Sequence, residues 1–500
     1  MAATIMGPRA AGVQRAIGRC ASRPAASPHR LAGRRRHDIA VRPQSKTTTT
    51  TTTTTRRSAT TDASEANGEF APFRSMSSPW EQEGKHELRR LGKLYKAVLK
   101  GPLQYSPIVL ICFAFVPIAH SYLLLSVLES FGINLPRFLV GMVAKTPFAG
   151  TAVGSKVYGA LSWLLELPPG TPGEEAWRVV LQTVIIFVPV LYLFVAVPVI
   201  DLLLGRDSRA QLANKTNLKE TNGYSFVLWA YCFLFFGLFC MSAMLAPSLR
   251  MIQLVGLTIS FGIYGGAYFT VGHELCHSTK RSEQILSQSM FALVCYMHWF
   301  CAHRRIHHKW VATAEDPTSA FKGESVYGFI PRSIFGQIGG AYNLEKSVGL
   351  RAIWAATPCL IAGALAVTLG AKAVVFYLGS ALVAILQLEI VNYIEHYGLR
   401  RKRLASGRYE PTGVQHSWNA DWLFSNCNMV DLQLHADHHT DSSRPFFSLR
   451  NIHEAPQMPA PYPVMMLMSL LPPLWFRVMD RRIEKYEEGN SQGTEAAATM

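Results

Sequence analysis

The chain has 500 residues, of which 49% are apolar and only 16% are charged, and its formal net charge is +16. Ordinary globular proteins carry roughly 25% charged residues, so these proportions and a mean hydropathy of +0.14 exclude a typical soluble domain and indicate an integral membrane protein. Nucleic-acid binding loses its main support, because most of the positive charge lies in the first 61 residues, which hold twelve Arg or Lys and one acid.

Residues 1–61 are rich in Arg, Ser, Ala and Thr and lack the apolar core of a secretory signal. This composition is typical of an organelle transit peptide. We therefore expect residues 1–61, with their Thr run, to be a targeting leader, and the protein to lie in a plastid or mitochondrial membrane. A plain basic tail is the alternative. Residues 62–105 are expected to be a linker and juxtamembrane segment.

Six stretches are apolar over a length close to the roughly 20 residues that a helix needs to cross a bilayer. They are 106–129, 179–204, 225–247, 252–271, 352–370 and 373–394. The sequence therefore predicts an all-α integral membrane protein with about six transmembrane helices in residues 106–482, and a disordered tail at 483–500. Loop cations, apart from those at 131–178, are concentrated on one side, which predicts that this side is cytoplasmic, stromal or matrix.

Nine of the sixteen histidines fall in four motifs, HELCH, HRRIHH, EH and HADHH, all on this same predicted side. They are His273, His277, His303, His307, His308, His396, His435, His438 and His439. Residues three or four apart share one face of a helix, so each longer motif can direct its rings toward one point. The expected sets are His273 with His277, His303 with His307, and His435 with His438 and His439.

Nine nitrogen ligands are more than one metal ion can bind, since zinc, for example, usually takes four ligands. Two metal ions are therefore predicted. The set contains no thiolate and lies at a membrane surface, which favours iron in O₂ chemistry over structural zinc. Histidines bound to a metal usually fix their second ring nitrogen with an acceptor. The nearest acidic candidates are Glu274, Asp316, Glu395 and Asp437.

At these motifs the chain resembles the membrane-bound alkane 1-monooxygenase (alkane hydroxylase) family of non-haem di-iron enzymes. The resemblance covers about residues 195–482 and rests on the strings HELCHS, HHKWVATAEDPTSA, NYIEHYGLRRKRLASGRYE, HSWN, LQLHADHH, APQMP and LPPLWFRVMD. Residues that depart from the family's usual pattern are Ser278, Ala302, Ile306, Leu434 and Ala436. None of these departures removes a histidine, so they bear on substrate range.

The resemblance implies that the nine histidines hold two iron ions and that the enzyme converts a medium- or long-chain alkane to a 1-alkanol with O₂ and two electrons. The alkane, or another long apolar chain, would enter from the lipid bilayer. No CxxC pair is present for a built-in rubredoxin, so an external rubredoxin or ferredoxin is expected. A cationic strip is the predicted docking site, with a membrane anchor as the alternative: Arg304, Arg305, Lys309, Arg400, Arg401, Lys402 and Arg403.

Two other functions fit part of the pattern. A membrane desaturase or hydroxylase acting on a fatty-acyl lipid or a carotenoid uses the same histidine chemistry, and the altered second motif leaves it open. The isolated His396 in NYIEHYG favours the alkane family. A non-catalytic metal transporter would need ionisable residues inside the spans as an ion path, and few occur beyond Asp201, Glu389 and His120.

Overall fold

The computed structural model describes residues 186–207 and 221–498, together with a few single residues between 155 and 183. In this part of the chain the regular structure is helical, with isolated bridges and no β-strand, which confirms the predicted all-α class. The predicted leader at 1–61, the linker at 62–105 and the first predicted span at 106–129 lie outside the described residues.

Four described helices are long and apolar enough to cross a membrane. They are α9 (Thr221–Leu245), which continues into the 3-10 turn η6 (Ala246–Ser248), α10 (Met251–His277), α15 (Val348–Leu369) and α16 (Ala371–His396). They match the last four predicted spans. In the second predicted span the structure describes α7 (Val188–Leu191), the π-turn η3 (Tyr192–Ala196) and α8 (Val197–Leu204). The count of six is therefore not confirmed.

Helices α10 and α16 pack closely because small residues of α10 face α16. A Cβ at Gly262 would lie 2.4 Å from the Cβ of Val383, and a Cβ at Gly266 would lie 2.5 Å from the Cδ of Gln387. Small residues allow this close approach between membrane helices. A step of four residues along α10 matches a step of four along α16 in the same direction, so the helices run parallel. Their C-terminal ends, which carry predicted ligands, lie at the same end of the bundle.

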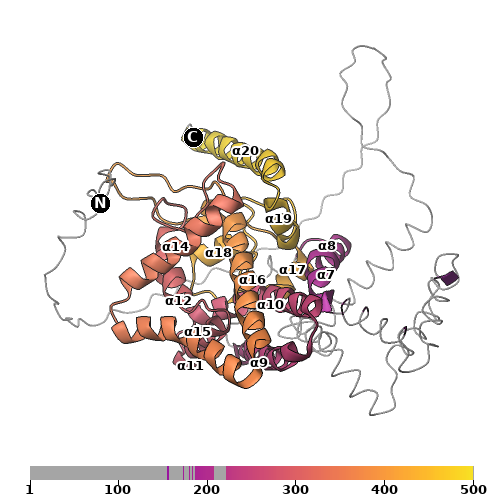
Figure 1. Ribbon diagram of the computed structural model, residues 1–500. Helices are drawn as coiled ribbons and strands as arrows, with labels where there is room; N and C mark the ends of the chain where they lie inside the picture. Colours follow the sequence, from indigo (N-terminus) through magenta and orange to yellow (C-terminus); the bar gives the residue numbers. More distant parts are fainter. Residues whose placement is uncertain are drawn as a thin grey trace, which may run out of the picture. The chain divides into compact units, whose positions relative to one another are not determined.

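Shorter elements pack around these long helices or extend from their C-terminal ends. In Figure 1, α10 and α16 lie in the middle of the described part, α9 and α15 toward the bottom, and α19 (Tyr462–Ser469) and α20 (Pro472–Ala498) toward the top. The shorter elements are α11 (Arg281–Leu293), α12 (Trp299–Ala302), the π-turn η7 (His303–His307), α13 (His308–Trp310), α14 (Val326–Leu344), the 3-10 turn η8 (Val414–His416), α17 (Leu423–Asn428), α18 (His435–Thr440), the 3-10 turn η9 (Phe446–Ser448) and α19 (Tyr462–Ser469).

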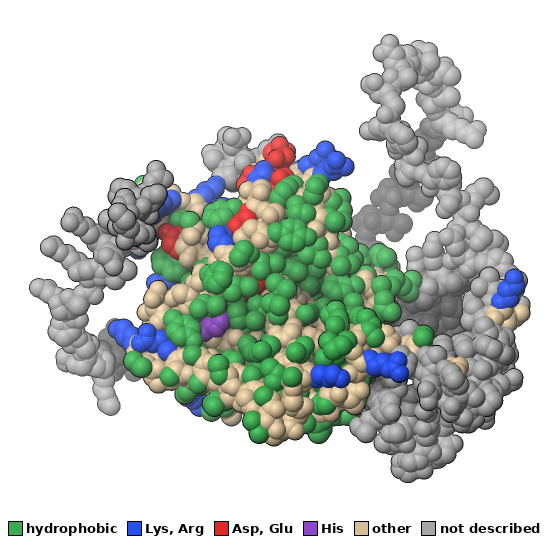
Figure 2. Space-filling model, in the orientation of Figure 1, with side chains coloured by type: hydrophobic (Ala, Val, Ile, Leu, Met, Phe, Trp, Pro, Cys, Tyr) green, Lys and Arg blue, Asp and Glu red, His purple; other side chains and the backbone are tan. Residues whose placement is uncertain are grey.

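Aromatic rings fill the space between the long helices, and hydrophobic side chains cover much of their outer surface. The ring of Phe235 stacks on those of Phe261 and Tyr268, with centroid distances of 5.2 and 4.9 Å. Figure 2 shows a broad belt of hydrophobic side chains on one face, with acidic side chains gathered near its top. An apolar surface of this extent is unusual for a soluble monomer and is suited to contact with lipid chains.

A helical backbone continues into residues 483–498, the greater part of the predicted disordered tail at 483–500. Helix α20 (Pro472–Ala498) continues through this segment. Ile483 is buried, and the hydroxyl of Tyr486 donates to the backbone carbonyl of Glu454 at 2.8 Å. These two contacts hold the start of the segment, residues 483–486, against the rest of the protein. Its charged composition alone does not predict such packing.

Candidate metal centre

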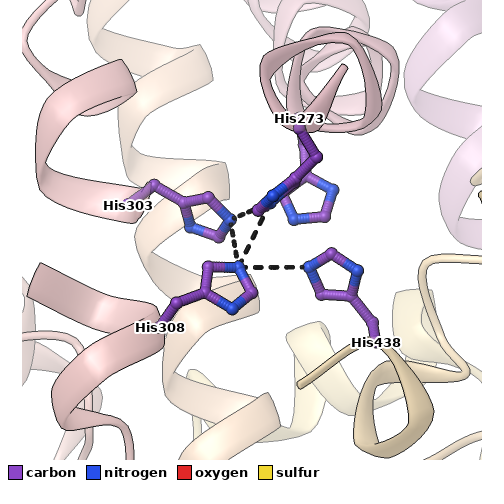
Figure 3. A group of neighbouring side chains, drawn as sticks. His273, His303, His308 and His438 are labelled. Carbon is purple, nitrogen blue, oxygen red and sulfur yellow. Dashed lines mark hydrogen bonds between the residues drawn. The ribbon is translucent and has the colours of Figure 1, made fainter. Parts of the chain in front are cut away.

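The structure brings the nine predicted histidines into two adjacent groups. Within each group the potential ligand atoms all lie within 4.8 Å of one another. The first group is His273, His277, His303, His308 and His438, and the second group is His307, His396, His435 and His439. Figure 3 shows rings of the first group turned toward a common point, although they come from three separate segments of the chain.

Helical spacing explains most of the grouping. His273 and His277 lie one turn apart at the end of α10, and both belong to the first group. His435 and His439 are one turn apart on α18 and both belong to the second group, whereas His438 faces the first group. The short helix α18 therefore lies between the two groups and contributes to both of them.

The HRRIHH motif does not follow the predicted geometry. His303 and His307 were expected to share a face, but they lie in different groups. The reason is the π-turn η7, in which the backbone N–H of His308 bonds to the carbonyl of His303, five residues earlier. This wider turn places His303 and His308 together and directs His307 to the other side. Single π-turns inside helices are frequent at functional sites.

The positions of the ring nitrogens fit metal ions. The Nε2 atom of His308 lies 3.0 Å from that of His303, 3.1 Å from that of His277 and 3.2 Å from that of His438. One ring nitrogen cannot satisfy three others by hydrogen bonding, because it is either a donor or an acceptor. Two nitrogens about 2.1 Å from one ion and at right angles are about 3.0 Å apart. The buried Nε2 of His273 also has no hydrogen-bond partner among the described residues.

Burial keeps these rings in the form that binds metal. It lowers the pKa of five rings outside the long helices well below the ordinary value, and neighbouring imidazoles lower the pKa further; these rings are His303, His308, His435, His438 and His439. The rings are therefore neutral at physiological pH. Neutral imidazole is the species that ligates a metal ion.

Asp316 lies behind His307. Its Oδ2 atom is 2.9 Å from the Nδ1 of His307, and the hydroxyls of Thr318 and Ser319 donate to the same carboxylate at 2.8 and 2.6 Å. Burial alone would raise the pKa of Asp316, but His307 and these hydrogen bonds lower it to about 2. The ionised carboxylate therefore holds His307 with Nε2 directed at the second group. The EDPTSA string after the second motif carries these residues.

The other three acidic candidates lie elsewhere. Glu395 faces the ligand side, with its Oε2 atom 3.3 Å from the Nε2 of His435. Its other oxygen accepts a bond from the hydroxyl of Tyr462 at 3.1 Å, a contact that no local sequence signal predicts. Glu274 accepts from the backbone of the 446–450 segment, and Asp437 pairs with Arg450 of the same segment. These two acids anchor a loop and do not contact a histidine nitrogen.

A narrow cavity reaches the histidines from between α10 and α16. At one end it is lined by rings from both groups, including His273 and His435. Its other walls are mainly apolar and include Phe269, Trp299, Leu388, Val391, Met429 and Leu432. Gly266 also lines it, seven residues before His273 on α10, so the cavity extends about 10 Å along that helix. The lining between the two long helices is therefore mainly apolar as far as the two histidine groups.

The predicted cationic strip is partly tied into the fold. Arg401 donates to the backbone carbonyl of Lys309 at 3.0 Å, and Arg305 pairs with Glu345 at 3.5 Å. Arg400 is half-buried, with its guanidinium over the ring of Phe321. Four members are exposed and have no acidic partner within 4.0 Å among the described residues: Arg304, Lys309, Lys402 and Arg403. The strip therefore offers less free charge than its sequence suggests.

Comparisons with known proteins agree with this arrangement. Residues 248–468 match the fatty acid desaturase family model. The chain is 34% identical over 361 residues to alkane 1-monooxygenase 2 of Pseudomonas aeruginosa, covering 67% of this chain and 94% of the relative. It is 34% identical over 316 residues to alkane 1-monooxygenase of Acinetobacter baylyi, covering 59% and 76%. It is 38% identical over 248 residues to alkane 1-monooxygenase 1 of Pseudomonas aeruginosa, covering 47% and 65%.

These three relatives come from bacteria, which contain no plastids or mitochondria. Their source conflicts with the predicted transit peptide at residues 1–61 and gives no support to an organelle membrane. The predicted membrane association itself agrees with the four long apolar helices. All nine histidines lie within residues 248–468, the region that matches the family model.

Proposed function

Because the chain belongs to the alkane 1-monooxygenase family, we propose that it hydroxylates the terminal carbon of medium- or long-chain alkanes with O₂ and two electrons at a di-iron centre. Membership of the family makes it a monooxygenase, an enzyme of the oxidoreductase class. The observation that carries the proposal is the meeting of two histidine groups with an apolar cavity between membrane-spanning helices.

In this proposal the five rings of the first group hold one iron ion and the four rings of the second group hold another. Bound iron supplies the reduction of O₂, and imidazole is a suitable ligand for it. The chain keeps the rings neutral through burial and fixes the orientation of His307 through Asp316. It also surrounds the centre with Phe269, Trp299 and other apolar side chains, which limit the access of water.

The alkane reaction is RH + O₂ + 2 e⁻ + 2 H⁺ giving ROH + H₂O. An alkane dissolves in the bilayer and can enter the cavity from the lipid side. Transfer of each CH₂ group from water to an apolar site is favourable by about 0.8 kcal/mol. The alkane comes from lipid, which is as apolar as the cavity, so its transfer into the cavity changes the free energy little. Selection of the terminal carbon then depends on position along the cavity. A chain end that reaches His273 and His435 presents its methyl group to both histidine groups.

The electrons come from another protein in this proposal. The sequence contains no CxxC pair that could form a rubredoxin site, so a rubredoxin or ferredoxin is the expected donor. Two one-electron deliveries supply each turnover. The protons come from water on the side of the membrane where the histidines lie.

A desaturase or hydroxylase acting on a fatty-acyl lipid is the second candidate. The match of residues 248–468 to the fatty acid desaturase family model favours it. The same histidine groups and the same apolar cavity would serve an acyl chain, and the two functions differ only in what the chain end carries. Product identification therefore distinguishes them.

The buried acids within the apolar helices argue against a metal-transport function, because both are already used in hydrogen bonds that hold the fold together. Asp201 accepts hydrogen bonds from the backbone N–H groups of Phe424 and Ser425 at 2.8 and 3.1 Å, at the start of α17. Glu389 accepts from the hydroxyl of Tyr296 at 3.0 Å and from the amide of Gln337 at 2.8 Å. Both carboxylates cross-link helices and do not line an ion path.

The test is a reconstituted turnover assay. The full chain is purified in detergent, loaded with iron and supplied with a reduced electron donor, O₂ and alkanes of graded length, and the products are identified by mass spectrometry. A 1-alkanol with one oxygen atom from ¹⁸O₂ supports the proposal. An alkene or a hydroxylated lipid would select the second candidate, and full activity in iron-free protein would overturn both.

A further inference from the structure

A basic groove lies between α20 and the 453–457 segment. Arg477, Arg481 and Lys485 line it. They follow one another at intervals of four residues on α20, so they share one face of that helix. Arg482 and His453 line it as well, and the lining contains no acidic side chain. We call this surface, with Trp418 at its inner wall, the basic groove.

The charge of the basic groove is not neutralised within the described part of the chain. Arg477, Arg481 and Lys485 have no acidic side chain within 4.0 Å there. Acids of α20 engage other partners, since Glu484 pairs with Lys322 at 3.0 Å and Asp480 accepts from the hydroxyl of Tyr397 at 2.8 Å. The groove thus presents a concentrated positive field to an approaching partner.

The inner wall of the basic groove is close to the second histidine group. Trp418 lines the groove and donates through its indole N–H to the carbonyl of Tyr397 at 2.9 Å. The backbone N–H of Trp418 bonds to the carbonyl of Glu395 at 2.9 Å. The neighbouring Ser417 hydroxyl lies 3.5 Å from the Nδ1 of His396, whose Nε2 belongs to the second group. The side chain of Trp418, its backbone link to Ser417 and one hydrogen bond from the Ser417 side chain therefore connect the groove to a histidine of the centre.

We propose that the basic groove docks a small acidic one-electron-transfer protein and that Trp418, Ser417 and His396 form a route for the electron from it to the centre. This inference rests on the proposed function and names the surface that its electron donor uses. In each docking event the donor loses one electron and the centre gains one. Two events supply the two electrons of a turnover, and the two protons come from water.

The basic groove fits this role better than the predicted cationic strip. Arg305, Arg400 and Arg401 of the strip are already engaged with Glu345, Phe321 and backbone carbonyls. Like the exposed strip cations Arg304, Lys309, Lys402 and Arg403, the groove's cations have no acidic partner among the described residues, and the groove adds an aromatic side chain at an inner wall that leads toward His396. Opposite charge accelerates docking and makes it sensitive to salt.

The test measures reduction of the iron-loaded full chain by a reduced acidic bacterial rubredoxin in stopped-flow experiments. The groove variant carries Arg477→Gln, Arg481→Gln and Lys485→Gln. The matched control carries Arg304→Gln, Lys402→Gln and Arg403→Gln, three exposed cations of the strip. We expect the groove variant to lower the second-order rate constant at low salt by about tenfold and to flatten its salt dependence. The control should change the constant by less than about twofold.

Reduction by dithionite separates docking from the centre itself. Both variants should be reduced by dithionite at the rate of the unmodified chain and should then form product equally. The proposal would be overturned if rubredoxin reduced the groove variant as fast as the unmodified chain, or if the control variant lost more of the rate constant than the groove variant. If the groove variant binds phosphatidylglycerol vesicles more weakly but is reduced by rubredoxin at an unchanged rate, the groove contacts the membrane surface and the docking proposal is wrong. If dithionite supports no hydroxylation in the unmodified chain, the proposed function fails instead.

The route is tested by Trp418→Phe and Trp418→Leu at saturating rubredoxin. The aromatic replacement should retain most of the limiting electron-transfer rate, whereas Trp418→Leu should lower it and leave the half-saturating rubredoxin concentration unchanged. Iron content and dithionite reduction show that each variant retains its centre. Equal limiting rates in Trp418→Leu and the unmodified chain would exclude this route.

Discussion

His303 and His308 direct their Nε2 atoms at each other across 3.0 Å, although five residues separate them in the sequence. An α-helix brings residues three and four apart together, so this pairing depends on the π-turn η7 between them. The same turn directs the Nε2 of His307 to within 3.1 Å of that of His439 in the second group. One widened turn thus allows a single segment to serve both groups.

Deleting Arg305 tests the role of this turn. The deletion leaves His303 and His308 four residues apart, so an ordinary helix still places them on one face, but the segment up to His307 is one residue shorter and its ring is displaced from the second group. We expect the iron content to fall from about two ions per chain to about one, measured by mass spectrometry of the metal in purified protein. The control Arg305→Ala removes only the exposed pair with Glu345. Two ions in the deletion variant would show that the turn is not needed.

Single substitutions test the division into two groups. His308→Ala removes a ring from the first group, and His435→Ala removes one from the second. We expect each to lose about one iron ion, and we expect the spectra of the remaining ion to differ between the two variants, because five rings surround one site and four surround the other. The control His453→Ala changes an exposed ring outside both groups. Identical residual spectra would argue for one shared site.

The sequence predicts the class of fold and the histidines, because both depend on local signals. Apolar length identifies α9, α10, α15 and α16, and the motifs contain all nine rings that gather. The π-turn could not be predicted, since HRRIHH has the same spacing in an ordinary helix. The order of α20 also depends on distant contacts, such as that of Tyr486 with Glu454.

The residues around the groups were predicted less well, because sequence distance says little about which acid lies behind a ring. Asp316 follows His307 by nine residues, and a loop folds back to bring them together. Asp437 lies within a histidine motif, yet it points away and pairs with Arg450. The basic groove was missed because its cations, Arg477, Arg481, Arg482 and Lys485, alternate with acids along the sequence, and only the fold shows which of them face Trp418.

Asp316→Ala tests whether the carboxylate behind His307 tunes the centre. Acceptors behind a ligating histidine typically contribute 10- to 100-fold in metal affinity, and we expect a loss of about that size in chelator competition. Asp437→Ala is the matched control, since Asp437 is equally buried but bonds to arginines. Asp437→Ala should lower stability with little effect on affinity. Equal affinity losses in the two variants would assign Asp316 a purely structural role.

Gly262→Ala tests the close packing of α10 and α16. The added Cβ would lie 2.4 Å from that of Val383 and 2.8 Å from the carbonyl oxygen of Ser380, so the helices must move apart. Overpacking of this kind costs about 1–3 kcal/mol, which should lower the midpoint of thermal unfolding in detergent. Gly237→Ala on α9 is the control, because a Cβ there meets nothing within 4 Å. That variant should be neutral or slightly stabilised, since Ala favours a helix over Gly.

Leu388→Trp tests whether the cavity between α10 and α16 holds the substrate chain. Leu388 lies seven residues before Glu395 on α16, and both line the cavity, so a larger side chain at 388 fills the end about 10 Å from the histidines. Long alkanes would then fail to reach the centre with their terminal carbon, whereas shorter ones would still fit. We expect the ratio of turnover on short chains to turnover on long chains to rise about tenfold, corresponding to roughly 1.4 kcal/mol between the two transition states. Leu382→Trp is the control, because Leu382 is 56% exposed on the outer surface of the same helix. An unchanged chain-length profile in Leu388→Trp, with iron content intact, would place the substrate outside this cavity.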